Sequence, residues 1–185
     1  INKKKIPRII NLITCGGQTS IPIIEEISQV LKKKLDYVEL VSSISSKSAG
    51  AATRENINEY IINTESAIKQ LTKIKKTKVI ININPSNPPV NMMNSLFFEL
   101  KKPLSRKNYL KISARIKYIN KIIKSYIPNY NAKIFPQIEK KILRITIRVV
   151  GQGDYLPSYA GNLDIITSSA VHLAKKIYEK KRINN

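Results

Sequence analysis

Apolar residues recur along this chain with two different periods, one typical of helices and one typical of strands. From Ser105 to Tyr126, isoleucines return every three or four positions and basic residues fill the other faces, which predicts an amphipathic helix. Residues 143–149 instead alternate apolar and polar side chains, as in a strand with one solvated face. The segment 132–139 lies just before this strand and is expected to pair with it.

Shorter apolar runs predict the remaining strands. They lie at 6–14, 37–46, 78–84 and 95–100, and the third of them ends in the proline cluster of residues 85–89. Strands and helices alternate in the first half of the chain, and a one-sided strand follows late. We therefore expect an α+β fold, whose sheet is mixed or antiparallel and carries its helices on one face.

Three further helices follow from apolar periodicity and capping signals. The first is expected to be capped by Thr19 or Ser20, to carry Pro22 at its first position and to fade at residues 32–35. A loop at 47–56 precedes a helix from about 53 to 71, and a closing helix begins near residue 161. The residues expected to face inward are Ile57, Tyr60, Ile61, Ala67, Ile68 and Leu71 in the second helix and Ile166, Ala170, Leu173 and Ile177 in the third.

The length of 185 residues suits one domain of ordinary size, and 42% hydrophobic residues suffice for a core. The longest uncharged apolar runs, such as 79–83, are far shorter than the roughly 20 residues of a membrane span. A single cysteine excludes an internal disulfide. These features predict a protein of the reducing cytoplasm.

A net charge of +21 raises the possibility of a polyanionic partner. The excess comes from 26 lysines and only 7 arginines, whereas bidentate recognition of phosphates and bases favours arginine. Lysine is also spread through the chain together with isoleucine and asparagine. The charge therefore favours a solvated lysine-rich surface, with a non-enzymatic basic protein that binds nucleic acid or other polyanions as the alternative.

Cys15 is followed by Gly16 and Gly17 and then by a helix start. A thiolate is stabilised at a helix N-terminus, and amide groups of side-chain-free glycines can hold the oxyanion of a substrate carbonyl. This environment suits acyl transfer through a thioester. The other interpretation is a small apolar residue buried at a strand end, because free cysteines are often buried.

His172 is the only histidine, and it lies on the closing helix away from the apolar stripe. We interpret it as a surface residue rather than a general base. Since no cluster of cysteine and histidine is present, no metal site is expected.

Three long segments together resemble the acylating acetaldehyde dehydrogenases, NAD-dependent enzymes that convert acetaldehyde and coenzyme A into acetyl-CoA. A fourth stretch, from Lys78 to Met93, falls where that family has a run ending in a proline pair and two methionines. The resemblance covers most of residues 9–175. The three segments are TCGGQTSIP at 14–22, SISSKSAGAATRENINEY at 43–60 and YLPSYAGNLDIITSSA at 155–170.

The resemblance implies that Cys15 is the nucleophile, which forms a thiohemiacetal with the aldehyde, loses hydride to NAD⁺ and passes the acyl group to coenzyme A. Taken alone, the segment 48–56 and the later asparagine also read as ordinary capped helix starts. By resemblance they bind the nicotinamide side of the cofactor. These cofactor-binding residues are Ser48, Ala49, Gly50, Ala51, Ala52, Thr53, Arg54, Glu55, Asn56 and Asn162.

The resemblance also implies the architecture of glyceraldehyde-3-phosphate dehydrogenase. Residues 1–158 would form the catalytic and dimerisation domain, and 159–185 a helix that docks on an NAD-binding domain. Because no glycine-rich dinucleotide fingerprint is present, we expect the chain to lack that domain and to be a fragment or a degenerate copy. The partners implied are a second copy in a homodimer and a 4-hydroxy-2-oxovalerate-type aldolase, in the catabolism of aromatic compounds.

Two departures from the family pattern concern the site itself. Gly50-Ala51-Ala52 stands where the family usually has Gly-Pro-Gly. The acidic residue that the family carries after its methionine pair is replaced here by Asn94 or Ser95, depending on the alignment. If that carboxylate positions or activates the thiol, the second departure affects activity directly.

Overall fold

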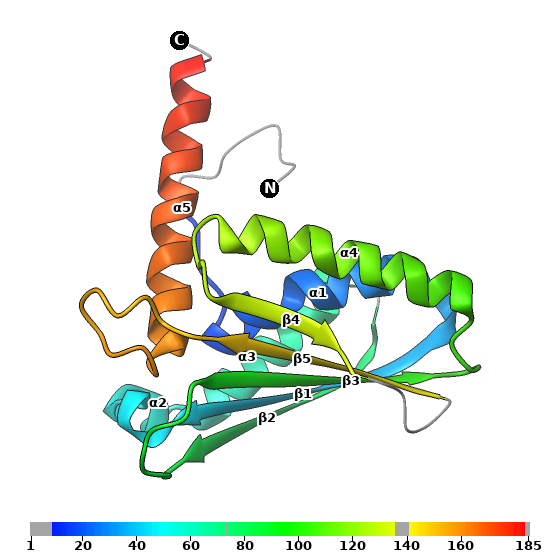
Figure 1. Cartoon of the computed structure of the whole chain (residues 1–185), viewed down its shortest axis with the longest axis horizontal. Coiled ribbons are helices and arrows are strands. Elements are labelled where there is room, and N and C mark those ends of the chain that lie inside the picture. Colours follow the sequence, from blue (N-terminus) through cyan, green and yellow to red (C-terminus); the bar gives the residue numbers. More distant parts are fainter. Residues whose placement is uncertain (1–8, 73, 136–140, 184–185) are drawn as a thin grey trace.

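The computed structural model describes residues 9–72, 74–135 and 141–183, and within them five strands form one mixed sheet in the order β2-β1-β3-β5-β4 (Figure 1). The larger helices lie on one face of this sheet. The elements are α1 (Cys15–Leu31), η1 (Lys32–Lys34), β1 (Leu35–Ser45), η2 (Ser46–Ser48), α2 (Ala51–Glu55), α3 (Ile57–Leu71), β2 (Lys76–Asn84), β3 (Met92–Leu100), α4 (Arg106–Lys124), β4 (Tyr130–Ile134), β5 (Ile142–Val149) and α5 (Gly161–Ile183).

The sheet contains one parallel pair, β1 with β2, and three antiparallel pairs. A parallel pair needs a crossover connection, and α2 and α3 supply it between β1 and β2. β3 then lies antiparallel to both β1 and β5 at the centre of the sheet. The expected α+β fold with a mixed sheet is confirmed, as are the strands predicted at 37–46, 78–84, 95–100 and 143–149 and the pairing of residues 132–134 with the last of these.

Side chains of β3 alternate strictly between the two faces of the sheet. Leu96 and Phe98 are fully buried beneath the helices, whereas Met93 and Glu99 are exposed on the other face. α1 lies over the central strands of the sheet, between α3 and α4, so Ile23, Ile24 and Ile27 are fully buried. Full burial of one such side chain stabilises the fold by about 1.5–3 kcal/mol.

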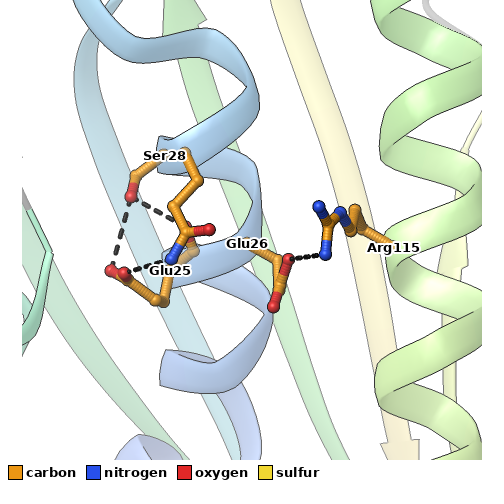
Figure 2. A network of polar contacts seen from close by, with 5 residues as sticks. Glu25, Glu26, Ser28 and Arg115 are labelled. Atoms are coloured by element: carbon orange, nitrogen blue, oxygen red, sulfur yellow. Dashed lines mark hydrogen bonds and ion pairs between the residues drawn. The ribbon is translucent and has the colours of Figure 1, made fainter.

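The predicted amphipathic helix is α4, and its buried residues are the expected isoleucines Ile112, Ile116, Ile119 and Ile123. Ser105 caps it by accepting a hydrogen bond from the Asn108 amide at 3.3 Å. A polar contact also joins α4 to α1, because Arg115 Nη1 lies 3.4 Å from Glu26 Oε2 (Figure 2). The basic side of α4 otherwise faces solvent, as the pattern predicts.

The prediction of a strand at 6–14 is wrong for residues 9–14, and residues 6–8 lie outside the residues that the structure describes. Residues 9–14 form no strand, and the Ile9 side chain is 81% exposed. Ile13 instead packs over Gly17, in the space that a side chain at Gly17 would need. A short apolar run does not by itself separate a strand from a segment that packs against its own helix.

The first helix begins earlier than expected, at Cys15, and its cap is Thr14 rather than Thr19 or Ser20. Thr19 and Ser20 are buried inside α1, where the Thr19 hydroxyl donates to the Cys15 carbonyl at 2.7 Å. Pro22 lies in the interior of the helix. The prediction failed because two glycines argue against a helix unless the tertiary structure requires them there.

The segment predicted as a loop at 47–56 contains η2 and the short helix α2, and the next helix begins at Ile57 rather than near 53. The break falls at Asn56, whose backbone leaves helical geometry. Ile68 is buried and Tyr60, Ile61 and Ala67 are partly buried, as expected. Leu71 is 53% exposed, contrary to the prediction, because the helix ends there.

α5 is the closing helix, but its buried face is rotated from the predicted one. Ile165 and Ser169 are buried, whereas Ala170 is exposed and Ile166 only partly buried. On the same helix, the partly buried His172 stacks on Tyr126, with ring centroids 4.6 Å apart. In Figure 1 the helix rises away from the sheet and its C-terminal half stands clear of the other elements.

None of the helices in the described residues combines the length and the apolarity needed to cross a membrane.

Candidate active site

The N-terminus of α1 is anchored to its surroundings by Thr14. The Thr14 hydroxyl oxygen accepts a hydrogen bond from the Gly17 amide at 3.1 Å, which caps the helix. The same hydroxyl lies 2.6 Å from the hydroxyl of Thr64 on α3. Cys15, the predicted nucleophile, is therefore the first residue of a helix whose start is fixed against a second helix.

The two glycines after Cys15 are explained by close packing. A side chain at Gly16 would collide with the hydroxyl of Tyr60 and would lie 2.7 Å from the Ser42 hydroxyl oxygen. A side chain at Gly17 would collide with Ile13. The expected role of both amides as oxyanion donors is only half available, because the Gly17 amide already donates to Thr14.

Burial raises the pKa of the Cys15 thiol to about 11. Hydrogen bonds from the Gly16 amide and from Tyr60 favour the thiolate, but desolvation of the sulfur outweighs them. Cys15 is itself only partly buried. The direction of its pKa shift runs against the expected ionised resting thiol, because desolvation of the sulfur opposes the helix N-terminus.

Tyr60 and Ser42 form a hydroxyl pair beside the sulfur. The Tyr60 hydroxyl donates to the Ser42 hydroxyl oxygen at 3.0 Å, and it lies near enough to Cys15 for each group to affect the pKa of the other. Desolvation by burial, followed by the neighbouring Cys15, raises the pKa of Tyr60 far above its ordinary value, so the phenol stays protonated. Sequence analysis placed Tyr60 on the inward face of its helix, but nothing in the pattern indicated a partner for its hydroxyl.

Asn94 is the residue after the methionine pair that faces the site. Its side-chain amide donates to the Ser20 hydroxyl oxygen at 2.8 Å and to the Gly16 carbonyl at 3.3 Å. Ser95 points to the opposite face of the sheet, so Asn94 is the one of the two residues that faces the site. The Asn94 side-chain oxygen is buried and has no hydrogen-bond partner among the described residues.

The predicted cofactor-binding segment and Asn162 meet in the structure, although they lie 114 positions apart in the sequence. The Asn162 side-chain amide donates to the Ser48 carbonyl at 3.1 Å, and both residues are buried. The Asn162 side-chain oxygen is also buried and finds no hydrogen-bond partner in the described part of the chain. Here a buried acceptor lies beside the loop that follows β1.

Arg54 holds that loop in shape rather than pointing outward as a free charge. Its guanidinium donates to the carbonyls of Ala49 and Ser46, each at 3.0 Å, and to the Ser46 hydroxyl at 2.8 Å. Ala49 is buried, whereas Gly50, Ala51 and Ala52 are exposed at the start of α2, and a side chain at Gly50 would meet open space. The remaining predicted residues, Thr53, Glu55 and Asn56, complete α2 and the break after it, where Asn56 donates to the Ala52 carbonyl at 2.9 Å.

The turn before α5 fixes the position of Asn162. Gly161 packs so tightly against the Val149 carbonyl at the end of β5 that no side chain fits there. Asp164 accepts a hydrogen bond from the Gln152 amide at 2.7 Å, and the Gly151 amide donates to the Ser158 carbonyl at 2.7 Å. The start of α5 is therefore tied to the end of the sheet.

A family profile described as "Prokaryotic acetaldehyde dehydrogenase, dimerisation" matches residues 15–157. This match begins at Cys15 and contains the segment 48–56 and the sheet. The chain belongs to this family of prokaryotic acetaldehyde dehydrogenases. The resemblance inferred from the three sequence segments is thereby confirmed.

Individual acetaldehyde dehydrogenases give the same result. The chain is 42% identical over 170 residues to acetaldehyde dehydrogenase of Pectobacterium atrosepticum, which covers 92% of the chain and 56% of the relative. It is 40% identical to the Burkholderia thailandensis protein, covering 94% and 57%, and 40% identical to the Spirochaeta aurantia protein, covering 90% and 54%. The chain thus spans a little over half the length of these relatives.

Proposed function

We propose that this chain is the catalytic and dimerisation half of a coenzyme A-acylating acetaldehyde dehydrogenase. The observation that carries the proposal is the family match that starts at Cys15, together with the position of this cysteine at the first residue of α1 among buried polar groups. The same match supports oxidation of an aldehyde as the reaction class.

Cys15 would act as the nucleophile. Its thiolate attacks the aldehyde carbon, and the carbonyl oxygen takes up a proton, which gives a thiohemiacetal. Loss of hydride from that carbon, with loss of the hydroxyl proton, leaves an acyl thioester on Cys15. The coenzyme A thiol then takes the acyl group and Cys15 is released as the thiol. The Gly16 amide is a hydrogen-bond donor beside the sulfur and would be available to this chemistry.

Bound NAD⁺ supplies the acceptor for the hydride. The residues of this chain fit the nicotinamide end of that cofactor, because the buried side-chain oxygen of Asn162 has no partner among the described residues and a carboxamide group is a hydrogen-bond donor. Gly50 leaves open space next to the same loop. We assign Asn162 and residues 48–56 to holding the nicotinamide end of the cofactor.

Binding of the remainder of the cofactor would need a separate dinucleotide-binding domain. The C-terminal half of α5 is a suitable docking element for it, because this half of the helix stands clear of the sheet and exposes Tyr178 to 67%. Residues 159–185 would in this way join the two domains, while residues 1–158 form the catalytic and dimerisation domain.

The homodimer would form through the face of the sheet that no helix covers. That face carries half-buried Phe97 and exposed Met93, and Arg144 lies over the rings of Phe97 and Phe135 at 5.5 and 4.9 Å. The Thr146 hydroxyl on this face is buried without a hydrogen-bond partner among the described residues. An apolar and partly unsatisfied sheet face suits contact with a second copy. An aldolase that delivers the aldehyde would be a further partner.

The test is acylation of Cys15 in the reverse direction. The chain is incubated with acetyl-CoA and its mass is measured, with Cys15→Ser as the control. Gain of one acetyl group on the wild-type chain, absent from the control, is the expected result because the chain has no other cysteine. Absence of acylation at pH 9, with thiol alkylation intact, would contradict the acyl-transfer function.

A further inference from the structure

The Tyr60 hydroxyl occupies a position created for it by three elements. α3 supplies the ring, Gly16 of α1 leaves the space in which the hydroxyl sits, and Ser42 of β1 receives its hydrogen bond at 3.0 Å. Ser42 is fully buried. A buried tyrosine needs a hydrogen-bond partner, but Ser42 alone would satisfy it. This geometry places the hydroxyl beside Gly16, the residue that directly follows Cys15, and so next to the sulfur as well as to Ser42.

We propose that Tyr60 is a positioning residue that stabilises the thiolate of Cys15 through its hydroxyl, with Ser42 as the supporting group behind it. The inference rests on the nucleophilic role of Cys15 given under the proposed function. In the resting chain the Tyr60 hydroxyl donates to Ser42. A hydroxyl group both donates and accepts and is free to rotate, so the direction of the chain of hydrogen bonds is reversible.

When the sulfur loses its proton to solvent, the direction of these hydrogen bonds reverses. Ser42 then donates to the Tyr60 oxygen, and Tyr60 donates to the thiolate. The Tyr60 and Ser42 oxygens therefore stay bonded to each other in both states. Hydrogen bonds to a charged acceptor are the stronger ones, which favours the reversed arrangement only once the sulfur is ionised.

Among the side chains near the sulfur, Tyr60 is the one that can stabilise the thiolate of Cys15. The groups that favour the thiolate are the Gly16 amide, the amide of Cys15 itself and the Tyr60 hydroxyl, and in the described residues no lysine, arginine or carboxylate contributes. Asn94 and Ser20, which also lie near this end of α1, are neutral and bonded to each other, and the Thr14 and Thr64 hydroxyls are likewise paired. Tyr60 is therefore the side chain through which the protein adjusts the thiol.

The test is the pH dependence of alkylation of the single cysteine by iodoacetamide, followed for the full chain by mass spectrometry. Tyr60→Phe should react about tenfold or more slowly than wild type at pH 8 and shift the rate profile to higher pH, because one hydrogen bond to the thiolate is lost. Ser42→Ala should shift the profile in the same direction by a smaller amount. Tyr118→Phe, at a half-exposed tyrosine of α4, is the matched control and should leave the profile unchanged.

An unchanged profile in a folded Tyr60→Phe variant would overturn the proposal and reduce Tyr60 to a packing residue. If that variant does not fold, Ser42→Ala decides the question, because it keeps the tyrosine ring and removes only the supporting hydroxyl. The readout requires no acyl transfer. If the variants shift the alkylation profile as expected but acetyl-CoA does not acylate the wild-type chain, the proposed function is contradicted and the role of Tyr60 is not. If acetyl-CoA acylates the chain but wild type and Tyr60→Phe have the same alkylation profile, the role of Tyr60 is contradicted and the proposed function is not.

Discussion

The hydroxyl of Tyr60 fills the volume that a side chain at Gly16 would occupy. The glycine after the cysteine is thus fixed by a tyrosine 44 positions later in the chain. This relationship joins α1 to α3 at the candidate nucleophile, and it provides the first of the following predictions.

Gly16→Ala should destabilise the protein by about 1–3 kcal/mol, because the new methyl group overpacks the contact with Tyr60. Gly50→Ala is the matched control, since its methyl group meets open space, and its cost should stay at or below about 1 kcal/mol. Thermal unfolding measures both. In the double variant Gly16→Ala with Tyr60→Phe, part of the lost stability should return, and a cost equal to the sum of the two would argue against the contact.

Alkylation of wild-type Cys15 should accelerate about tenfold per pH unit from pH 7 to pH 10, because only the thiolate reacts and the pKa of this thiol is raised to about 11. Rates with iodoacetamide across this range provide the measurement. A rate that levels off below pH 9 would mean that the sulfur ionises more easily than its burial implies.

Asn162→Ala should remove the bond to the Ser48 carbonyl and loosen the loop at 46–52, at a cost of about 1–2 kcal/mol. Amide hydrogen exchange of this loop should become faster, while the core strands keep their protection. Leu163→Ala, at the next and more exposed position, serves as the control. Equal protection of the loop in both variants would show that Asn162 does not hold it.

Asn94→Asp should make stability depend on pH. The new carboxyl group is buried and faces the Gly16 carbonyl and the Ser20 hydroxyl, so its folded-state pKa should lie above its unfolded value. Its protonated form is then the favoured one in the fold, so stability is retained below the unfolded pKa and is lost as pH rises through the folded pKa. Urea unfolding from pH 4 to pH 8 measures the slope, and Ser95→Asp on the opposite face should show little of it.

Phe97→Glu should dissociate the homodimer, because it places a charge at the centre of the uncovered sheet face next to Arg144 and the rest of the apolar patch. Sedimentation velocity gives the oligomeric state. Tyr118→Glu, on α4 and away from that face, should leave the dimer intact. A wild-type chain that is monomeric at micromolar concentration would contradict the proposed interface.

The regular periodic segments were predictable from sequence, and the start of α1 was not. The α4 helix and the β5 strand have clean periods of 3.6 and 2, so burial decides their structure and the pattern reveals it. At residues 14–17, by contrast, local propensity argues against a helix. Thr64 and Tyr60 stabilise the helix start from another element, and no local pattern reveals such contacts.

Some features of the candidate site were likewise predictable from sequence, and others were not. Cys15, Asn162 and the segment 48–56 were identified from motifs, and the bond between Asn162 and Ser48 brings two of these together. The hydroxyl pair of Tyr60 and Ser42 was missed, because a tyrosine on the inward face of a helix reads as an apolar residue. The direction of the thiol pKa shift could not be predicted from the segment around Cys15, because desolvation depends on how the rest of the fold packs around the sulfur.

The raised pKa of Cys15 also affects how fast the protein reacts with oxidants. Peroxides and other electrophiles attack thiolates, and the reaction climbs through sulfenic to irreversible sulfinic and sulfonic acids. A sulfur that keeps its proton while idle presents little of the vulnerable form. The same burial that raises the pKa of Cys15 is therefore expected to protect the single thiol of this chain from irreversible oxidation.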